Sequence, residues 1–392
     1  MDRYNGASQV EVDLDSLRHN LSEVRRHIRA DCAIVGVVKA DAYGHGALAV
    51  SRALFGAGVT QLGVARVEEG LALRETGIRD AAILVMGGMR EADAEWVVRY
   101  RLEPAIFGLD CIKALERAAS AQNALVSVHI KVDSGMGRLG LKPQRLGEFL
   151  QKITAIKHVA VRGIMTHFAS AESDPEFTAR QLGELHHALK TIPEQRRRKL
   201  TFHACNSAAI LTTQAAHFDV VRSGTLLYGH PPASDFRCNL DLKPILSWKT
   251  EVLSIKEISA GDSVGYGRLF TAARDSRVAV LPVGYADGFT RALSNKASVL
   301  IGGKRAPIIG WISMNMMTVD ITEHRKVSIG DEAVLLGRQG AETITAWELA
   351  DLIGTDVAEI LCAIKPHIRR THKETLYEDR LVTHGGVAPQ RR

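Results

Sequence analysis

Short apolar runs rich in Val and Ile alternate with segments of helical period through the first half of the chain. Strands of a parallel sheet are typically apolar throughout, because helices bury both faces of such a sheet. Runs of this kind predict strands at residues 33–40, 61–65, 81–87, 103–107, 125–133, 159–168, 201–206 and 219–222.

Segments of helical period precede and separate these runs. They predict helices at residues 15–28, 47–55, 66–75, 92–100, 111–121, 144–156, 176–189 and 208–216. This regular succession of strands and helices favours an α/β fold whose parallel sheet closes into a (β/α)8 barrel of the TIM type. An open doubly wound sheet is the alternative, and the regularity of the repeats favours the barrel.

The pattern changes at residues 230–243, HPPASDFRCNLDLK, where prolines and polar residues indicate a linker. Alternating β-branched segments follow and predict a mainly antiparallel β domain, interrupted by a helix at 346–353. Its strands are expected at residues 247–258, 277–283, 297–301, 308–312 and 332–336. We therefore expect a barrel domain at 1–238, a β domain at 239–384 and a disordered tail at 385–392.

Composition limits the classes of partner. The 392 residues carry a formal net charge of +6, but the basic residues form no stripe interleaved with aromatic residues, so nucleic acid is not expected. The amino terminus lacks an apolar signal core, and no apolar run could span a bilayer. Five widely spaced cysteines without metal-ligand spacing indicate free thiols and no metal site. We expect a cytoplasmic protein without membrane contact.

Lys39 stands where an apolar strand is predicted to end, in the stretch 34–46, IVGVVKADAYGHG. A lysine at such a place commonly extends to solvent along its apolar stem. A partly desolvated amine would instead lose its proton readily and attack a carbonyl, as lysines that form Schiff bases do. Position alone does not decide between these interpretations.

Polar residues at the carboxyl ends of barrel strands converge on one face, the barrel mouth. A single histidine or arginine there is more often a core or ion-paired residue, but joint placement at one mouth favours function. The candidates are Lys39, Arg138, His167, His203, Asn206, Ser207 and Arg222.

A phosphate would bind near the loops after strands seven and eight, where Ser207 and the Ser-Gly-Thr turn at 223–225 supply hydroxyls and backbone N–H groups. An amine and a phosphate cradle at one mouth match the needs of pyridoxal 5'-phosphate (PLP). The segment 135–140, GMGRLG, fits a dinucleotide-binding pattern, but no acidic residue follows at the required distance, so that match is weak.

Two tyrosines in glycine-containing turns lie in the β domain, Tyr266 within 263–268 and Tyr285 within 284–288. Such turns usually serve packing. In a β domain that must meet a barrel mouth, they would also suit a catalytic lid, from the same chain or across a dimer. The stretch 310–317, GWISMNMM, is a further candidate.

Seven ordered motifs cover nearly the whole chain: VVKADAYGHG, DSGMGRLG, MTHFAS, the pair Asn206-Ser207, VRSGTLLYG, VGYGR and GYADGF. They resemble the motifs of the alanine racemases, PLP-dependent enzymes of fold-type III that work as homodimers. The resemblance implies interconversion of L-alanine and D-alanine by two bases, Lys39 and Tyr266 of the partner subunit.

The resemblance also implies roles for other residues. Lys39 would bind the cofactor covalently, Arg222 would face its pyridine nitrogen, and His167 would link this arginine to the catalytic tyrosine. Arginine holds its proton too tightly to pass it to the ring, which would limit side reactions. Carbamylation of Lys131 would brace Arg138. The cofactor contacts would be Tyr43, His203, Asn206, Ser207, Gly224, Thr225 and His372, and the substrate contacts Arg138, Tyr285, Met314 and Asn315.

The sequence departs from the family pattern at Trp311, Asn315 and His372, where Arg, Asp and a phosphate-contacting Tyr are usual. Because these changes bear on the substrate, a racemase of another small amino acid such as serine is the alternative. A fold-type III decarboxylase shares the domain plan, but it would be expected to place a carboxylate at the position of Arg222. A non-catalytic PLP-binding protein would commonly lack the β domain.

Overall fold

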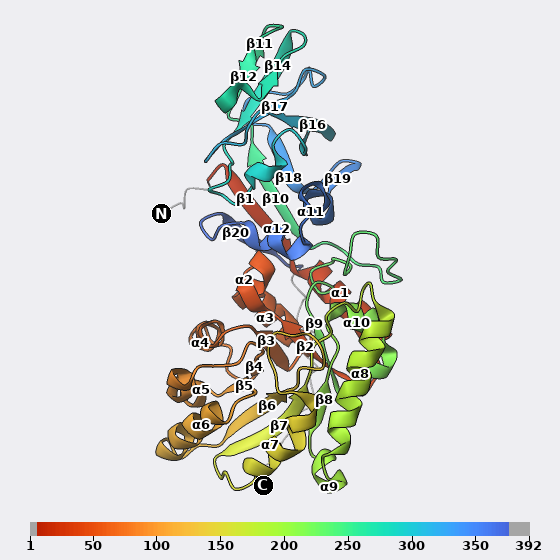
Figure 1. Cartoon of the computed structure of the whole chain (residues 1–392). Helices are drawn as coiled ribbons and strands as arrows, with labels where there is room; N and C mark the ends of the chain where they lie inside the picture. The colour runs from red at the N-terminus through yellow and green to blue at the C-terminus, as the bar shows by residue number, and fades with distance from the viewer. Residues whose placement is uncertain (1–5, 376–392) are drawn as a thin grey trace, which may run out of the picture.

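The computed structural model describes residues 6–375 and consists of a barrel and a β domain arranged end to end (Figure 1). The barrel strands pair in parallel in the order β8-β7-β6-β5-β4-β3-β2-β9. They are β2 (Ala33–Val37), β3 (Gln61–Val64), β4 (Ala82–Val85), β5 (Leu102–Ile106), β6 (Val126–Lys131), β7 (Val159–Met165), β8 (Thr201–His203) and β9 (Val220–Ser223).

Backbone hydrogen bonds join the two ends of this strand order. The N–H of Asp219 donates to the carbonyl of Phe202 at 3.2 Å, and the N–H of Arg222 donates to that of Cys205 at 3.1 Å. These bonds bring β9 against β8, so the sheet closes on itself. The predicted (β/α)8 barrel is confirmed.

The longer helices cover the outside of the barrel with one apolar face. In α6, for example, Ile112, Leu115 and Ala119 are buried, while Glu116 and Arg117 lie on the outer side. The helices are α1 (Leu14–His27), α2 (Lys39–Gly44), α3 (Ala47–Gly56), α4 (Val67–Glu75), α5 (Ala94–Arg99), α6 (Leu109–Ala121), α7 (Leu146–Lys152), α8 (Pro175–Lys190), α9 (Glu194–Arg197) and α10 (Ser207–Thr212).

The β domain is built on a sheet in the order β11-β14-β17-β16-β15-β18-β10-β1-β20, in which every pair except β1 with β20 is antiparallel. The prediction of a mainly antiparallel domain is therefore confirmed. Its elements are β1 (Ser8–Asp13), β10 (Leu246–Glu251), β11 (Ser254–Ile258), β12 (Ser263–Val264), β13 (Phe270–Thr271), β14 (Ser276–Leu281), β15 (Ser298–Ile301), β16 (Lys304–Ile309), β17 (Met317–Asp320), β18 (Glu332–Gln339), β19 (Glu342–Ile344), β20 (Arg369–Lys373), α11 (Ala346–Ile353) and α12 (Val357–Ala363).

The first strand of the chain lies in the sheet of the β domain, which the sequence did not predict. Val10 of β1 lies opposite Trp248 of β10 on one side and opposite Arg370 of β20 on the other. Val10 and Val12 are fully buried. Among the described residues, the first strand β1 and the last strand β20 therefore lie in the same sheet, and the barrel lies between them in sequence.

Several predicted boundaries were wrong. The strand expected at 33–40 ends at Val37, because the chain then enters a left-handed turn. The segment expected at 247–258 divides into β10 and β11, which pair with different strands. A second helix, α12, follows α11. The tail expected at 385–392 lies outside the residues that the structure describes.

The β domain packs on the barrel next to Lys39 (Figure 1). The Arg370 guanidinium donates to the Gly44 carbonyl at 3.1 Å, and His372 Nε2 lies 2.8 Å from the His45 carbonyl. Gly44 has a φ of +80°, and a Cβ there would lie 2.5 Å from the carbonyl oxygen of Leu361 in α12. The second domain thus fixes the backbone that carries Lys39.

Replacing Gly44 with Ala should destabilise the protein by about 2 kcal/mol or more, because the new Cβ clashes with backbone and the left-handed φ disfavours Ala. Gly56→Ala is the matched control, since Gly56 ends α3 with an ordinary φ, and a Cβ there would have no neighbouring atom within 4 Å. Thermal unfolding measures both variants. Equal midpoints would contradict the tight packing of α12 on the Lys39 turn.

Candidate active site

Lys39 follows β2 at the barrel mouth and is partly buried. Its Nζ lies 5.6 Å from the centroid of the Tyr43 ring. Burial, followed by the charge of Arg138, lowers the pKa of the Lys39 amine from its ordinary value. The structure therefore favours the desolvated amine over a solvated lysine, although the residue lies two positions beyond the end of its strand.

A left-handed turn sets the direction in which Lys39 projects. Residues 40–43 have φ between 51° and 54°, although none of them is glycine. Each such residue costs about 1–2 kcal/mol relative to a right-handed conformation, so the surroundings must hold the turn in place. The Ala42 N–H donates to the Val38 carbonyl at 2.9 Å, and the Asp41 carboxylate accepts from the Ala47 N–H at 2.7 Å.

Glu69 in α4 connects this turn to the neighbouring loop. Its carboxylate accepts hydrogen bonds from the backbone N–H groups of Ala40 and Ala65, both at 2.7 Å, and of Arg66 at 3.1 Å. One carboxylate thus satisfies donors after β2 and after β3. Glu69 was not predicted from the sequence, because an acidic residue in the first turn of a helix is common on energetic grounds alone.

Arg222 on β9 is buried beneath the mouth. Its guanidinium donates to the backbone carbonyls of Thr166 and Ala204 at 2.7 and 2.8 Å, and it lies 3.0 Å from His203 Nδ1 and 3.3 Å from His167 Nδ1. Its Nε has no partner among the residues described. Burial lowers the Arg222 pKa to about 10, and burial followed by the Arg222 charge keeps the pKa of both histidines well below the ordinary value.

Tyr43, Ser207 and Gly224 converge beside Lys39. Ser207 Oγ accepts from the Gly224 N–H at 3.0 Å. A Cβ at position 224 would lie 2.6 Å from Tyr43 Oη and 3.8 Å from Ser207 Oγ, so glycine keeps the space between two hydroxyls open. Thr225 is the next residue and is partly buried. Hydroxyls and N–H groups around a glycine form a suitable cradle for a phosphate.

Arg138 and Lys131 bring further positive charge to the mouth. Arg138 is exposed on the loop after β6. Lys131, at the end of β6, is buried and donates to the Met86 carbonyl at 2.9 Å. Burial, followed by the charge of Arg222 and then of Arg138, lowers the Lys131 pKa to about 8. A buried amine of this kind has a larger neutral, nucleophilic fraction near neutral pH than an ordinary lysine.

Three other predicted site residues form defined contacts with neighbouring residues of the chain. Asn206 caps α10, since its Oδ1 accepts from the Ala209 N–H at 3.0 Å. His203 is fully enclosed, with Arg222 at one ring nitrogen and His129 at the other. His372 on β20 contacts His45 and Gly46 rather than the Ser207 cradle.

A second group of predicted residues lies on the β domain. The Tyr285 N–H donates to the Ser313 carbonyl at 3.1 Å, which places Tyr285 beside Met314 and Asn315. Tyr266 lies between β12 and β13 and is 73% exposed, and Met314 is 56% exposed. The β12 end of the domain points away from the barrel (Figure 1). Within one chain, the described contacts do not join this group to Lys39.

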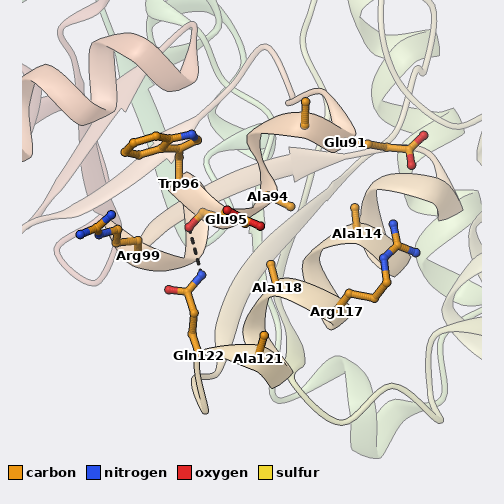
Figure 2. Close-up of a pocket in the computed structure, with 11 residues that line it drawn as sticks. Glu91, Ala94, Glu95, Trp96, Arg99, Ala114, Arg117, Ala118, Ala121 and Gln122 are labelled. Atoms are coloured by element: carbon orange, nitrogen blue, oxygen red, sulfur yellow. Dashed lines mark hydrogen bonds between the residues drawn. The ribbon is translucent and has the colours of Figure 1, made fainter.

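A groove of about 710 Å³ lies elsewhere, between α5 and α6 on the outside of the barrel (Figure 2). Alanines at 94, 114 and 118 leave this space, and Gln122 Nε2 donates to the Glu95 carbonyl at 3.2 Å. It contains none of the convergent groups found at the mouth. Within residues 6–375, no group of three His, Cys, Asp or Glu side chains is arranged to hold a metal, and no helix could cross a membrane.

Comparisons with known proteins agree with this geometry. The family model for the alanine racemase N-terminal domain matches residues 12–232, and that for the C-terminal domain matches residues 245–372. An alanine racemase of Symbiobacterium thermophilum is 43% identical over 362 residues, which cover 92% of this chain and 96% of that protein. One of Halothermothrix orenii is 39% identical over 368 residues, covering 94% and 97%.

Solved structures give the same result. The alanine racemase of Bacillus anthracis with bound L-Ala-P superposes with a TM-score of 0.89 at 32% identity, covering 95% of this chain and 96% of that one. The alanine racemase of Bartonella henselae with covalently bound pyridoxal phosphate gives 0.85 at 28% identity, covering 94% and 100%.

Glu69→Ala should destabilise the folded protein by about 1–3 kcal/mol, because three backbone N–H groups lose their acceptor. Glu68→Ala is the neighbouring control: Glu68 is largely exposed and lies 3.8 Å from Arg90, so its loss should change stability by less than about 0.5 kcal/mol. Thermal unfolding of the two variants provides the comparison. A Glu69 variant as stable as the Glu68 variant would show that the left-handed turn is held by other contacts.

Proposed function

The chain belongs to the alanine racemase family, and from this premise we propose that two copies of it interconvert L-alanine and D-alanine by a two-base mechanism with shared active sites. The observation that carries the proposal is the position of the desolvated Lys39 amine 5.6 Å from the ring centroid of Tyr43, which forms a cradle with Ser207 and Gly224. This is the arrangement that a phosphate-bearing aldehyde requires.

The cofactor of the family is pyridoxal 5'-phosphate, and the residues of this chain fit it. Arg222 Nε is a buried donor without a protein partner among the described residues, suited to the pyridine nitrogen, and the Gly224 cradle suits the phosphate. Lys39 would hold the cofactor covalently, and the Bartonella henselae structure contains covalently bound pyridoxal phosphate. When bound, the cofactor withdraws electrons from the α-carbon of the amino acid and makes its C–H bond acidic.

Lys39 then moves a proton at one face of the α-carbon. Burial lowers the pKa of the Lys39 amine from its ordinary value, which suits a group that must both accept and return a proton. A single base would tend to return the proton to the face it came from, so racemisation needs a second proton carrier on the opposite face.

Tyr266 of the partner subunit is the proposed second carrier. In one chain the Tyr266 side chain is exposed at the end of the β domain that points away from the barrel. A second copy, turned end to end, would bring this tyrosine to the mouth of the first. The exposed Tyr285 and Met314 would enter with it and line the substrate pocket with Asn315.

His167 is suited to support that tyrosine. Its Nδ1 faces the Arg222 guanidinium, which can only donate, so the ring proton lies on Nε2. Its low pKa keeps the ring neutral. We assign His167 the role of orienting the phenol, while the positive charge of Arg222 favours the phenolate that acts as a base.

Arg138 would hold the substrate carboxylate at the mouth, and Lys131 would brace it as a carbamate. A neutral amine reacts with carbon dioxide, and with a pKa of about 8 a substantial share of Lys131 is neutral near physiological pH. The product carries a negative charge in place of a positive one. It therefore relieves repulsion from Arg138 and Arg222 and supplies an acceptor for Arg138.

Substrate choice rests on the β-domain residues. The Arg291 guanidinium stacks at 4.4 Å over the ring of Trp311, so this pair fixes the loop that precedes Met314. We propose alanine as the main substrate, with L-serine included in the assay as the closest alternative.

All five cysteines have free thiols, which supports a cytoplasmic location.

Mixing two inactive chains tests the shared sites. Lys39→Ala and Tyr266→Phe homodimers should each lose nearly all racemase activity. A heterodimer of the two, isolated with two different tags, has one site with both bases intact and should regain about half of the parent activity per dimer. Racemisation of L-alanine in deuterated water, followed by optical rotation and α-deuterium content, gives the readout.

The control pairs Lys39→Ala with the double variant Lys39→Ala, Tyr266→Phe, which leaves no site with a lysine. It should stay inactive. A Lys39→Ala and Tyr266→Phe heterodimer that is no more active than this control would contradict the contribution of Tyr266 across the dimer.

Labelled bicarbonate tests the carbamate. Protein incubated with ¹³C-bicarbonate should show a carbamate carbon signal that disappears in Lys131→Ala and persists in Lys142→Ala, since Lys142 is exposed. Lys131→Ala should also raise the KM for alanine about tenfold, because Arg138 loses its acceptor. An unchanged signal in Lys131→Ala would place the modification elsewhere.

A further inference from the structure

A line of buried hydrogen bonds runs from the barrel mouth toward its opposite end. Arg222 Nη1 lies 3.0 Å from His203 Nδ1, and His203 Nε2 lies 2.9 Å from His129 Nδ1. His129 Nε2 lies 3.3 Å from Glu103 Oε2. The residues His129, His203 and Arg222 are each at most 4% exposed. No carboxylate within the described residues contacts Arg222 directly.

The two ends of this line determine its direction. A guanidinium can only donate, so His203 Nδ1 accepts and the proton of this neutral ring lies on Nε2. His203 therefore donates to His129 Nδ1, which leaves the His129 proton on Nε2, directed at Glu103. An ionised carboxylate can only accept, so Glu103 permits this direction and excludes the reverse.

Glu103 is held at the amino-terminal end of the barrel. Its other oxygen forms an ion pair with Arg162 of β7, and its side chain is 12% exposed. Burial raises the Glu103 pKa, but the hydrogen bond from His129 and the Arg162 charge outweigh this and keep it below the ordinary value. A surface groove of about 460 Å³ borders Glu103 and Arg162, so this end of the line lies at the edge of solvent.

We propose that Glu103 is a positioning residue for Arg222, and that it fixes the tautomers of His129 and His203 so that an acceptor always faces the guanidinium. His203 Nδ1 accepts from Arg222 Nη1, which leaves Arg222 Nε free to donate toward the cofactor. This role rests on the proposed function, because it concerns the arginine that would face the pyridine nitrogen.

Glu103→Gln should reverse the donor-to-acceptor direction of the hydrogen bonds between Glu103 and Arg222. Arg162 only donates, so the new amide turns its oxygen to Arg162 and its NH₂ group to His129. His129 Nε2 must then accept, both histidines change tautomer, and the His203 Nδ1–H faces the guanidinium N–H groups. In the holoenzyme with ¹⁵N-labelled histidine, we expect the protonated nitrogen of His203 to change from Nε2 to Nδ1. We expect kcat to fall about tenfold and KM to change less than about twofold.

Two further variants separate this effect from a loss of stability. Glu116→Gln is the matched control: Glu116 lies 2.8 Å from His158 Nδ1 on the outside of the barrel, and His158 has no onward link to Arg222 among the described contacts. It should keep the parent tautomer of His203 and the parent kcat. Adding Arg162→Leu to Glu103→Gln frees the amide oxygen to accept from His129 again, so the double variant should regain the parent tautomers and much of the lost kcat.

An unchanged His203 tautomer and an unchanged kcat in Glu103→Gln would overturn the proposal, as would an equal fall of kcat in Glu116→Gln. If Glu103→Gln does not fold, Glu103→Asp keeps an acceptor that cannot donate, and parent tautomers are expected there. Reversed tautomers in that variant would also overturn the proposal. The tautomers are read without turnover, so an inactive parent protein would contradict the racemase function and leave this measurement decisive for Glu103.

Discussion

The left-handed turn at residues 40–43 is the constraint on which the candidate site depends. Four residues that carry side chains adopt a conformation that costs free energy at each position, and the turn places the Lys39 amine and the Tyr43 ring on the same side. Contacts from two directions hold it. Glu69 of α4, in the barrel domain, accepts from the Ala40 N–H of the turn. Arg370 and His372, in the β domain, contact the carbonyls of Gly44 and His45 that follow the turn. The site therefore forms only where both domains meet.

The electrostatics of the mouth follow from placing several cations close together. Lys39, Lys131 and Arg222 are partly or fully buried, and Arg138 lies near the first two. Burial and mutual repulsion lower the pKa of both amines, which makes them nucleophilic. Arg222 retains its charge, since a pKa of about 10 still leaves it protonated at neutral pH. In the proposed function, these surroundings would prepare two lysines for covalent chemistry and leave one arginine as a fixed donor.

The sequence predicted the barrel well because its strands are apolar throughout and its helices have clear periodicity. It also proposed Lys39, Ser207 and Arg222 as site candidates, because their positions at strand ends indicate one face. It missed β1, because six residues that merge into a helix cap give too short an alternation. Glu103 and His129 lie within strands, and their common line with His203 appears only when β5, β6, β7 and β8 are placed in their order in the barrel. The left-handed turn left no signal, since none of its residues is glycine.

The parallel pairing of β1 with β20 has a consequence for biosynthesis. β1 is translated before the barrel, but its partners β10 and β20 are translated only after it, and β20 ends at Lys373. Domains generally fold as units while the chain grows. The barrel can therefore fold before β1 has strands to pair with. The turn that follows Lys39 gains its contacts with Arg370 and His372 only after β20 has been translated, so the β domain completes the surroundings of Lys39 later than the barrel does.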